Sequence, residues 1–299
     1  MNRVPPTICP YTLKPFAEIK VSEEHVIPDA LGGPAAFSVI ADEHWNGLYG
    51  SGLDADFVND DLMKAAAQFH NVKTRSGKAK LAVKGQLTYD KTVIAATVDN
   101  FAGDSPTIYP DKPVTDTGNC FEIIADDKNF AKLLATTIKN NASKGLQLQP
   151  SDLQKPGGTF HGRIEHSFWK KTLGLVKVGY LSLAYSFGDD FIRSSAGAAF
   201  RKAYESTTKT ELNNSGLDIT ELLFRGLLPP QSSRHKVAAV RDDNAYAVYV
   251  SLFEEQAFTR QFSFPANQIK LQSAQGLVYE VDAVRKKFTF RPFDAASDQ

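Results

Sequence analysis

Hydrophobic and polar residues alternate in the first part of the chain and then change to a helical spacing. Residues 16–27 alternate loosely and run into a Pro- and Gly-rich stretch at 28–34, which predicts a strand followed by a loop. Residues 37–41 fit a second short strand. From Asn46 onward, apolar residues recur at steps of three to five, which is typical of a helix. The chain is therefore predicted to begin strand, strand, helix.

Strand and helix patterns continue through the rest of the chain. Residues 78–98 contain two β-rich runs, 101–119 have the composition of a long loop, and residues 148–158 resemble a linker. A short strand at 120–125 precedes a helix that Asp126 or Asp127 can cap. Further helices are predicted at 164–187, 190–206 and 219–227, and the last third contains predicted strands at 235–240, 245–253, 258–264, 277–284 and 286–293.

These patterns predict an α+β protein. The N-terminal strand–strand–helix unit is followed by a larger mixed α+β unit with a helical pair and C-terminal antiparallel strands. The predicted division is an N-terminal unit at 1–75, a connecting α+β segment at 76–150 and a C-terminal unit at 151–299. A length of 299 residues fits more than one packed unit or one elaborated domain.

Composition narrows the class of protein. Hydrophobic residues make up 42% and charged residues 23%, which excludes disorder, collagen and coiled coil for the whole chain. Cys9 and Cys120 are too few for a disulfide framework, so a cytoplasmic location is expected. The most apolar stretch, 172–188, is interrupted by Lys177 and falls short of the ~18 apolar residues of a membrane span. No membrane partner is expected.

The net charge is zero, but the charges are unevenly distributed. Residues 1–61 hold ten acidic side chains against three basic ones. Residues 62–90 reverse this balance, with Lys64, Lys73, Arg75, Lys78, Lys80 and Lys84 against Asp90 alone. Carboxylates beside a basic strip suit a phosphodiesterase, because the acids hold a cation while Lys and Arg hold the nucleic-acid backbone. A solvated charged surface is the alternative interpretation.

One segment carries a specific pattern of chemistry. It reads SEEHVIPDALGG from Ser22 to Gly33, and Asn46-Gly47 and Gly50-Ser51-Gly52-Leu53-Asp54 follow it. This order resembles the HNH nucleases, the ββα-metal group, and in particular a bacterial branch with EHIIP-ALGG and CN-x-x-x-G-S-x-x-D motifs. The resemblance covers about residues 7–62. It implies an N-terminal ββα-metal nuclease unit.

The resemblance assigns a role to each polar residue of the motif. His25 would be the general base, since a neutral histidine can accept a proton from water near neutral pH. Glu24 and Asn46 would bind a divalent cation, and Asp54, about 80° around the helix from Asn46, would be a further ligand or a partner of one. Oxygen ligands favour Mg²⁺ or Mn²⁺. Nucleic acid would be bound by the basic strip, Lys73, Arg75, Lys78, Lys80 and Lys84, with Lys78, Lys80 and Lys84 on one face of a strand.

The chain departs from the family at three places. Members commonly carry two Cys-x-x-Cys pairs that bind a structural zinc, and here these positions are Cys9 and Thr12, then Asp42 and Trp45. Structural zinc is therefore expected to be absent. The central asparagine of the family would fall near Phe37 or Ser38, and Glu24 stands where aspartate is commoner.

Three other polar groups are secondary candidates for a site. The cluster of His161, Arg163, Glu165 and His166 fits a helix entry, although it could contact phosphate. His44 could substitute as a ligand. Lys170, Lys171 and Lys177 form an alternative nucleic-acid surface.

The sequence therefore predicts a metal-dependent endonuclease that hydrolyses DNA, more than RNA, in a setting such as bacterial defence. The alternative is a catalytically silent HNH scaffold that binds nucleic acid or a partner protein. A third hypothesis is a nuclease gated by a regulatory partner or ligand at residues 151–299. A homodimer is also left open.

Overall fold

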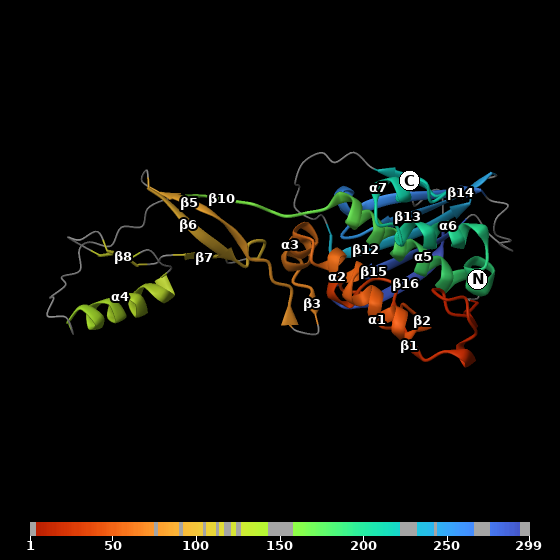
Figure 1. Cartoon of the computed structure of the whole chain (residues 1–299), viewed down its shortest axis with the longest axis horizontal. Helices are drawn as coiled ribbons and strands as arrows, with labels where there is room; N and C mark the ends of the chain where they lie inside the picture. Colours follow the sequence, from red (N-terminus) through yellow and green to blue (C-terminus); the bar gives the residue numbers. More distant parts are fainter. Residues whose placement is uncertain are drawn as a thin grey trace. The chain divides into compact units, whose positions relative to one another are not determined.

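The computed structural model describes most of the chain in eleven segments. These are residues 4–74, 77–89, 92–103, 106–111, 114–116, 121–123, 127–142, 158–221, 232–241, 244–265 and 276–293. The chain divides into two units (Figure 1). Unit 1 joins Met1–Ala79 to His166–Gln299, and unit 2 is Lys80–Glu165. Unit 1 thus combines two ends of the chain that the sequence-based division into three segments kept apart.

Unit 1 begins with an antiparallel hairpin followed by helices. Strands β1 (Val21–His25) and β2 (Ser38–Asp42) pair directly, and α1 (Glu43–Ser51) packs against both. These elements follow one another as strand, loop, strand and helix. The single predicted helix is in fact three, because Gly52 leaves helical geometry and Asp60 caps a new helix. The helices after α1 are α2 (Leu53–Val58) and α3 (Asp61–Phe69), and the short strands β3 (Lys73–Thr74) and β4 (Gly77–Lys78) follow.

The second part of unit 1 packs one long helix on a sheet. The sheet order is β11-β14-β13-β12-β15-β16, all antiparallel. Helix α5 (Phe168–Ile192) crosses β12, β13 and β14 and also contacts β2, α2 and α6 (Figure 1). Residues from Lys171 to Gly188 of this helix are buried without interruption. The strands are β11 (Asp218–Glu221), β12 (Arg234–Arg241), β13 (Ala245–Ser251), β14 (Thr259–Pro265), β15 (Gly276–Asp282) and β16 (Lys287–Pro292).

The predicted C-terminal elements are largely confirmed. All five strands of the last third form, and the helical pair is α5 with α6 (Ser195–Tyr204), followed by the short α7 (Lys209–Asn213). The kink at Gly188, whose φ is 58°, lies one residue after the predicted helix end. The predicted helix at 219–227 is wrong where it is described, because Asp218–Glu221 pairs with β14 as a strand. Its remaining residues lie outside the described part.

Unit 2 contains a four-stranded antiparallel sheet in the order β10-β5-β6-β7. The loop predicted at 101–119 contains a strand, because β7 pairs with the end of β6. Of the cluster at His161, His161 lies in β10, whereas Glu165 and His166 lie directly before α5, as the helix-entry interpretation expects. Most of the predicted linker lies outside the described residues. The elements of this unit are β5 (Val83–Tyr89), β6 (Thr92–Asp99), β7 (Thr107–Pro110), β8 (Val114–Asp116), β9 (Phe121–Ile123), α4 (Asp127–Ala142) and β10 (Gly158–Gly162).

The α+β class is confirmed, with several antiparallel sheets and helices. Among the described residues, no helix has the length and apolar character needed to cross a membrane.

The loop after β1 is locked onto the large sheet by a buried histidine. His235, on β12, has no exposed surface; its Nε2 lies 2.7 Å from the Leu31 carbonyl oxygen, and its Nδ1 accepts from the Phe253 amide at 3.0 Å. The ring is therefore neutral, with its proton on Nε2. Gly32 adopts a φ of 89°, and a Cβ there would meet the Ala283 backbone at 2.3 Å. A Cβ on Gly33 would meet the Ile27 carbonyl oxygen at 1.7 Å, so a close backbone approach explains each of the two glycines.

Acid should weaken this lock. Burial lowers the pKa of His235 from 6.5 to about 4. The folded state then binds fewer protons than the unfolded state between these two values, so stability is full above pH 6.5 and falls as the pH falls toward 4. The loss is on the order of 3 kcal/mol. Urea unfolding as a function of pH should show a shallower acid decline for His235→Gln than for the wild type. His44→Gln, at an exposed histidine, is the control, and equal slopes in all three proteins would contradict the assignment.

Candidate functional site

The β1–β2 hairpin has a covered face and an outer face. Its register pairs Glu24 with Val39 and His25 with Ser38. Glu24 and Val39 are buried, whereas Glu23 is exposed. Successive side chains leave a strand on opposite faces, so Glu24 points to the covered face and His25 shares the outer face with Glu23. The predicted base and the predicted metal ligand therefore leave β1 in opposite directions.

A buried ammonium group lies between the two predicted carboxylate ligands. Lys177 Nζ lies 3.1 Å from Glu24 Oε1 and 2.6 Å from Asp54 Oδ2. The side chains of Lys177, Glu24 and Asp54 are only 3%, 5% and 18% exposed, respectively. The structure thus brings Glu24 and Asp54 together, as the sequence predicted, but around a lysine from α5.

The contact between α2 and α5 explains why these groups meet. Asp54 and Phe57 are three residues apart on α2, and Gly174 and Lys177 are three apart on α5, so each pair lies on one helix face. A Cβ on Gly174 would meet the Phe57 ring at 2.3 Å. The missing side chain at Gly174 lets Phe57 rest on α5, and this places Asp54 beside Lys177.

Tyrosine rings complete the surroundings of the ammonium. Nζ of Lys177 lies 5.8 Å from the centre of the Tyr11 ring and 5.5 Å from that of Tyr49. The two rings are 4.7 Å apart, and Tyr204 packs against both. Aromatic faces attract cations at such distances, so the rings stabilise the ammonium while they exclude water.

Burial changes the acidity of this cluster. Desolvation raises the pKa of Glu24 to about 7; Lys177 opposes this rise, and the neighbouring charge of Asp54 adds to it. Desolvation and the charge of Glu24 also raise the pKa of Tyr11 well above its usual value. Burial away from water is therefore the main reason why protonation of Glu24 becomes easier.

Asn46 fastens α1 to β1. Its Nδ2 donates to Ser22 Oγ at 2.8 Å and to the Glu23 carbonyl oxygen at 2.9 Å. Asp42, the residue before α1, caps the helix by accepting from the amides of His44 and Trp45 at 3.0 and 3.2 Å. The amide group of Asn46 therefore has a structural task at the strand.

Of the four positions that would bind a structural zinc in the family, Cys9 contacts two others, Thr12 and Asp42. Cys9 is fully buried, and its Sγ accepts from the amides of Tyr11, Thr12 and Asp42 at 3.4, 3.5 and 3.2 Å. The contact with Asp42 joins the first pair of these positions to the second pair. Thr12 accepts from the Lys14 amide instead of offering a thiolate. The expectation that structural zinc is absent stays a prediction.

These residues do not fit a divalent cation as they stand. Both carboxylates share the Lys177 ammonium, and the Asn46 amide is tied to β1. Across the described ranges, no three His, Cys, Asp or Glu side chains form a group that could hold a metal ion. A cation bound by Glu24 and Asp54 would have to take the place of the ammonium.

His25 lies apart from this cluster. Its Nδ1 is buried and has no hydrogen-bond partner among the described residues. His44, the other candidate ligand, is exposed on α1 and packs against Trp45, with ring centres 6.1 Å apart. The structure therefore does not place an imidazole beside the Glu24 carboxylate.

The predicted basic strip is divided between the two units. The backbone of Lys73 in β3 pairs with that of Lys78 in β4, and both residues belong to unit 1. Lys80 and Lys84 belong to unit 2. The single strand expected to carry Lys78, Lys80 and Lys84 is wrong, because β4 ends at Lys78 and β5 begins at residue 83. Lys73, Lys80 and Lys84 are exposed. Arg75 lies outside the described residues.

The alternative lysine surface is also wrong. Lys171 and Lys177 are 1% and 2% exposed, and Lys170 pairs with Asp56 at 2.8 Å. Lys171 lies over the rings of Phe168 and Phe258, 4.6 and 5.1 Å from their centres. Helix α5 therefore does not present three cations to a ligand.

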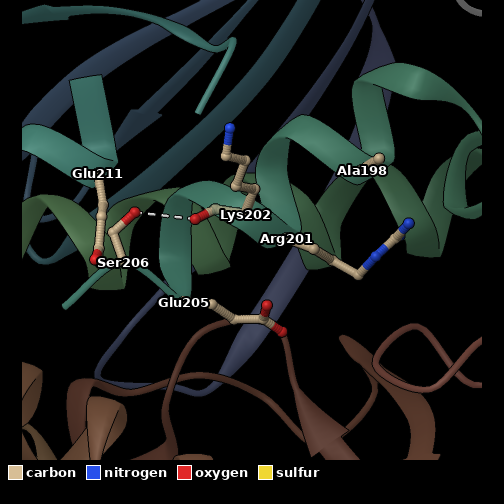
Figure 2. Close-up of a pocket in the computed structure, with 6 residues that line it drawn as sticks. All are labelled: Ala198, Arg201, Lys202, Glu205, Ser206 and Glu211. Atoms are coloured by element: carbon tan, nitrogen blue, oxygen red, sulfur yellow. Dashed lines mark hydrogen bonds between the residues drawn. The ribbon is translucent and has the colours of Figure 1, made fainter. Parts of the chain in front are cut away.

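A shallow hollow beside α6 and α7 contains further charged groups (Figure 2). Its lining comprises Ala198, Arg201, Lys202, Glu205, Ser206 and Glu211. The cations of this hollow already have partners: Arg201 donates to the Tyr180 hydroxyl and the Ile192 carbonyl oxygen, and Lys202 donates to the Asn214 carbonyl oxygen. Figure 2 shows the Arg201 and Lys202 side chains extending in different directions. The hollow is not built around one ligand position.

Comparison with models of protein families, with curated proteins and with solved structures finds no match for this chain. The arrangement of the site is therefore the basis for a functional assignment. Lys177 is the central residue that the motif did not indicate. Its signal in the sequence was a lone lysine inside the most apolar stretch of the chain.

Removing the ammonium alone should destabilise the protein strongly. Lys177→Met keeps the length of the side chain but leaves Glu24 and Asp54 buried without a counter-charge, which typically costs about 3–5 kcal/mol. Lys170→Met is the matched control on the same helix; its exposed pair with Asp56 contributes at most about 1 kcal/mol. Denaturant unfolding of both variants would measure the difference. A Lys177→Met protein as stable as the control would show that the buried pair is not needed.

Proposed function

We propose that this chain is a catalytically silent HNH-type scaffold that binds nucleic acid, DNA rather than RNA, without cleaving it. The observation that carries the proposal is the position of the Lys177 ammonium between Glu24 and Asp54. An ammonium compensates charge and donates hydrogen bonds. It cannot lower the pKa of a bound water or take a phosphate oxygen as a ligand, as a metal ion does.

The direction of His25 supports the same conclusion. A general base must lie within hydrogen-bond reach of the proton that it removes, and the attacking water would have to lie near the cation. His25 leaves β1 on the outer face, and Glu24 leaves it on the covered face. In the described structure, Nδ1 of His25 makes no hydrogen bond to Glu24.

The distribution of charge supports nucleic acid as the ligand. Most acidic side chains of residues 1–61 pair with lysines or cap helix N-termini, either in the interior or, for Glu43 and Asp56, at the surface. The residues concerned are Glu24, Asp29, Asp42, Glu43, Asp54, Asp56 and Asp60. By contrast, Lys73, Lys80 and Lys84 are exposed. Phosphate contacts need local positive charge and not a net charge on the whole protein, so Lys80 and Lys84, which both belong to unit 2, are the proposed binding surface.

The metal-dependent endonuclease with His25 as general base is the second candidate. Two observations favour it: Asn46 is held at the strand in the position that the motif predicts, and Nδ1 of His25 is left without a hydrogen-bond partner in the described structure. For this candidate, Glu24 and Asp54 would have to exchange the ammonium for Mg²⁺ or Mn²⁺.

A plasmid assay separates the two candidates. The purified protein should shift supercoiled plasmid in a gel equally well in Mg²⁺, Mn²⁺ and EDTA, and it should leave the plasmid uncut. His25→Ala should behave as the wild type does, because His25 has no catalytic task in a silent scaffold. Nicking that requires a metal and is lost in His25→Ala would establish the nuclease instead. Absence of both nicking and binding would refute nucleic acid as the ligand.

Salt dependence should identify the binding surface. Each lysine–phosphate contact adds about −0.9 to the slope of log K against log salt, so replacing Lys80 and Lys84 by alanine should flatten the slope by up to about 2. The loss should be equal for unrelated duplex sequences, because phosphate contacts do not read bases. Lys132 and Lys139, exposed on α4, provide a matched control when replaced by alanine. If both variants keep the wild-type slope, the surface lies elsewhere.

A further inference from the structure

The Glu24–Asp54 pair is arranged around a buried cation, whatever the chain binds. The two carboxylates come from β1 and α2, and both face the covered side of the hairpin where water is largely excluded. Like charges in such a place repel strongly unless a positive group lies between them. Lys177 supplies that group from α5, and it is the only ion-pair partner that the described residues give to either carboxylate.

The ammonium leaves part of this demand unmet. It brings one positive charge to two carboxylates, and Glu24 Oε2 is buried beside Tyr11 and receives no hydrogen bond of normal geometry in the described part of the chain. The ammonium contacts only Oε1 of this carboxylate. The site therefore offers one more oxygen ligand than the lysine uses.

The distances suit a metal ion near the position of the ammonium nitrogen. Nζ lies 2.6 and 3.1 Å from its two oxygen partners. Mg²⁺ and similar hard cations bind oxygen at about 2.0–2.1 Å and keep several waters. A small approach of the carboxylates would be sufficient, and the volume of the lysine side chain beyond Cβ would supply the room for the waters.

We propose that Lys177 is a built-in replacement for a divalent cation, and that Glu24 and Asp54 form a latent metal site that opens when this side chain is shortened. The inference concerns the cation alone, so it goes beyond the proposed function and does not require nucleic-acid binding. On this proposal, the hairpin needs no metal ion because a single residue of α5, Lys177, supplies the positive charge.

The test replaces Lys177 and then measures stability and metal binding with MnCl₂ as the only added ligand. Lys177→Ala removes the ammonium and leaves space, whereas Lys177→Met removes the charge but fills the space. Lys177→Ala combined with Asp54→Asn keeps the space and removes one of the two carboxylates. Each protein is refolded and melted with EDTA or with Mn²⁺, and the free Mn²⁺ is followed by its paramagnetic resonance signal.

Lys177→Ala is expected to bind one Mn²⁺ per chain and to melt at a higher temperature with Mn²⁺ than with EDTA. The wild type, Lys177→Met and the double variant should show neither effect. The proposal is overturned if Lys177→Ala folds but responds to Mn²⁺ no more than Lys177→Met, or if it folds neither with Mn²⁺ nor without it. Equal Mn²⁺ binding by the wild type would also overturn it, because the lysine would then not exclude the metal. None of these readouts depends on DNA, so failure here is distinct from failure of the proposed function.

Discussion

Burial of the Lys177 charge is the constraint on which the rest of unit 1 depends. The lysine lies in the middle of a helix that is covered on all sides from Lys171 to Gly188, so its ammonium cannot reach water. An uncompensated charge there would be costly enough to prevent folding, and Glu24 and Asp54 supply the compensation. Because these partners come from β1 and α2, α5 must dock on the N-terminal hairpin for either to be stable. The two distant segments of the chain therefore form one unit.

The same docking gives structural tasks to most residues of the HNH-like motif. Gly32 allows the loop to approach the Ala283 backbone, the Leu31 carbonyl lies against the buried His235, and Asn46 ties α1 to β1. Each of these contacts would be needed to hold the hairpin on the sheet even if no reaction took place. The motif alone is therefore weaker evidence for catalysis than its residue types suggest. What decides between scaffold and enzyme is the group that lies between the carboxylates.

Local pattern predicted the elements well and their long-range pairing poorly. The hairpin, the helical pair and the five C-terminal strands follow from alternation or helical spacing, which each segment carries in itself. The strand at Asp218–Glu221 was predicted as a helix because its pairing with β14 depends on a distant segment and leaves no pattern in the local sequence. The meeting of Glu24 with Asp54 was predicted from the motif. The partner from α5 was not, because a lysine in an apolar run can equally well be a surface residue, and only tertiary packing shows that it is buried.

The exchange of a metal ion for an ammonium has an asymmetric consequence for chemistry. Either cation can neutralise two neighbouring carboxylates. Only the metal has open coordination positions for water and for a phosphate oxygen, and only it can supply a hydroxide near neutral pH. A lysine therefore preserves the architecture of such a site while it removes the chemistry. Since the lysine is covalently attached, its local concentration does not depend on the metal content of the surroundings. The proposed scaffold has to keep its shape without catalysis. A buried Lys–Glu–Asp cluster at the predicted metal centre meets this requirement.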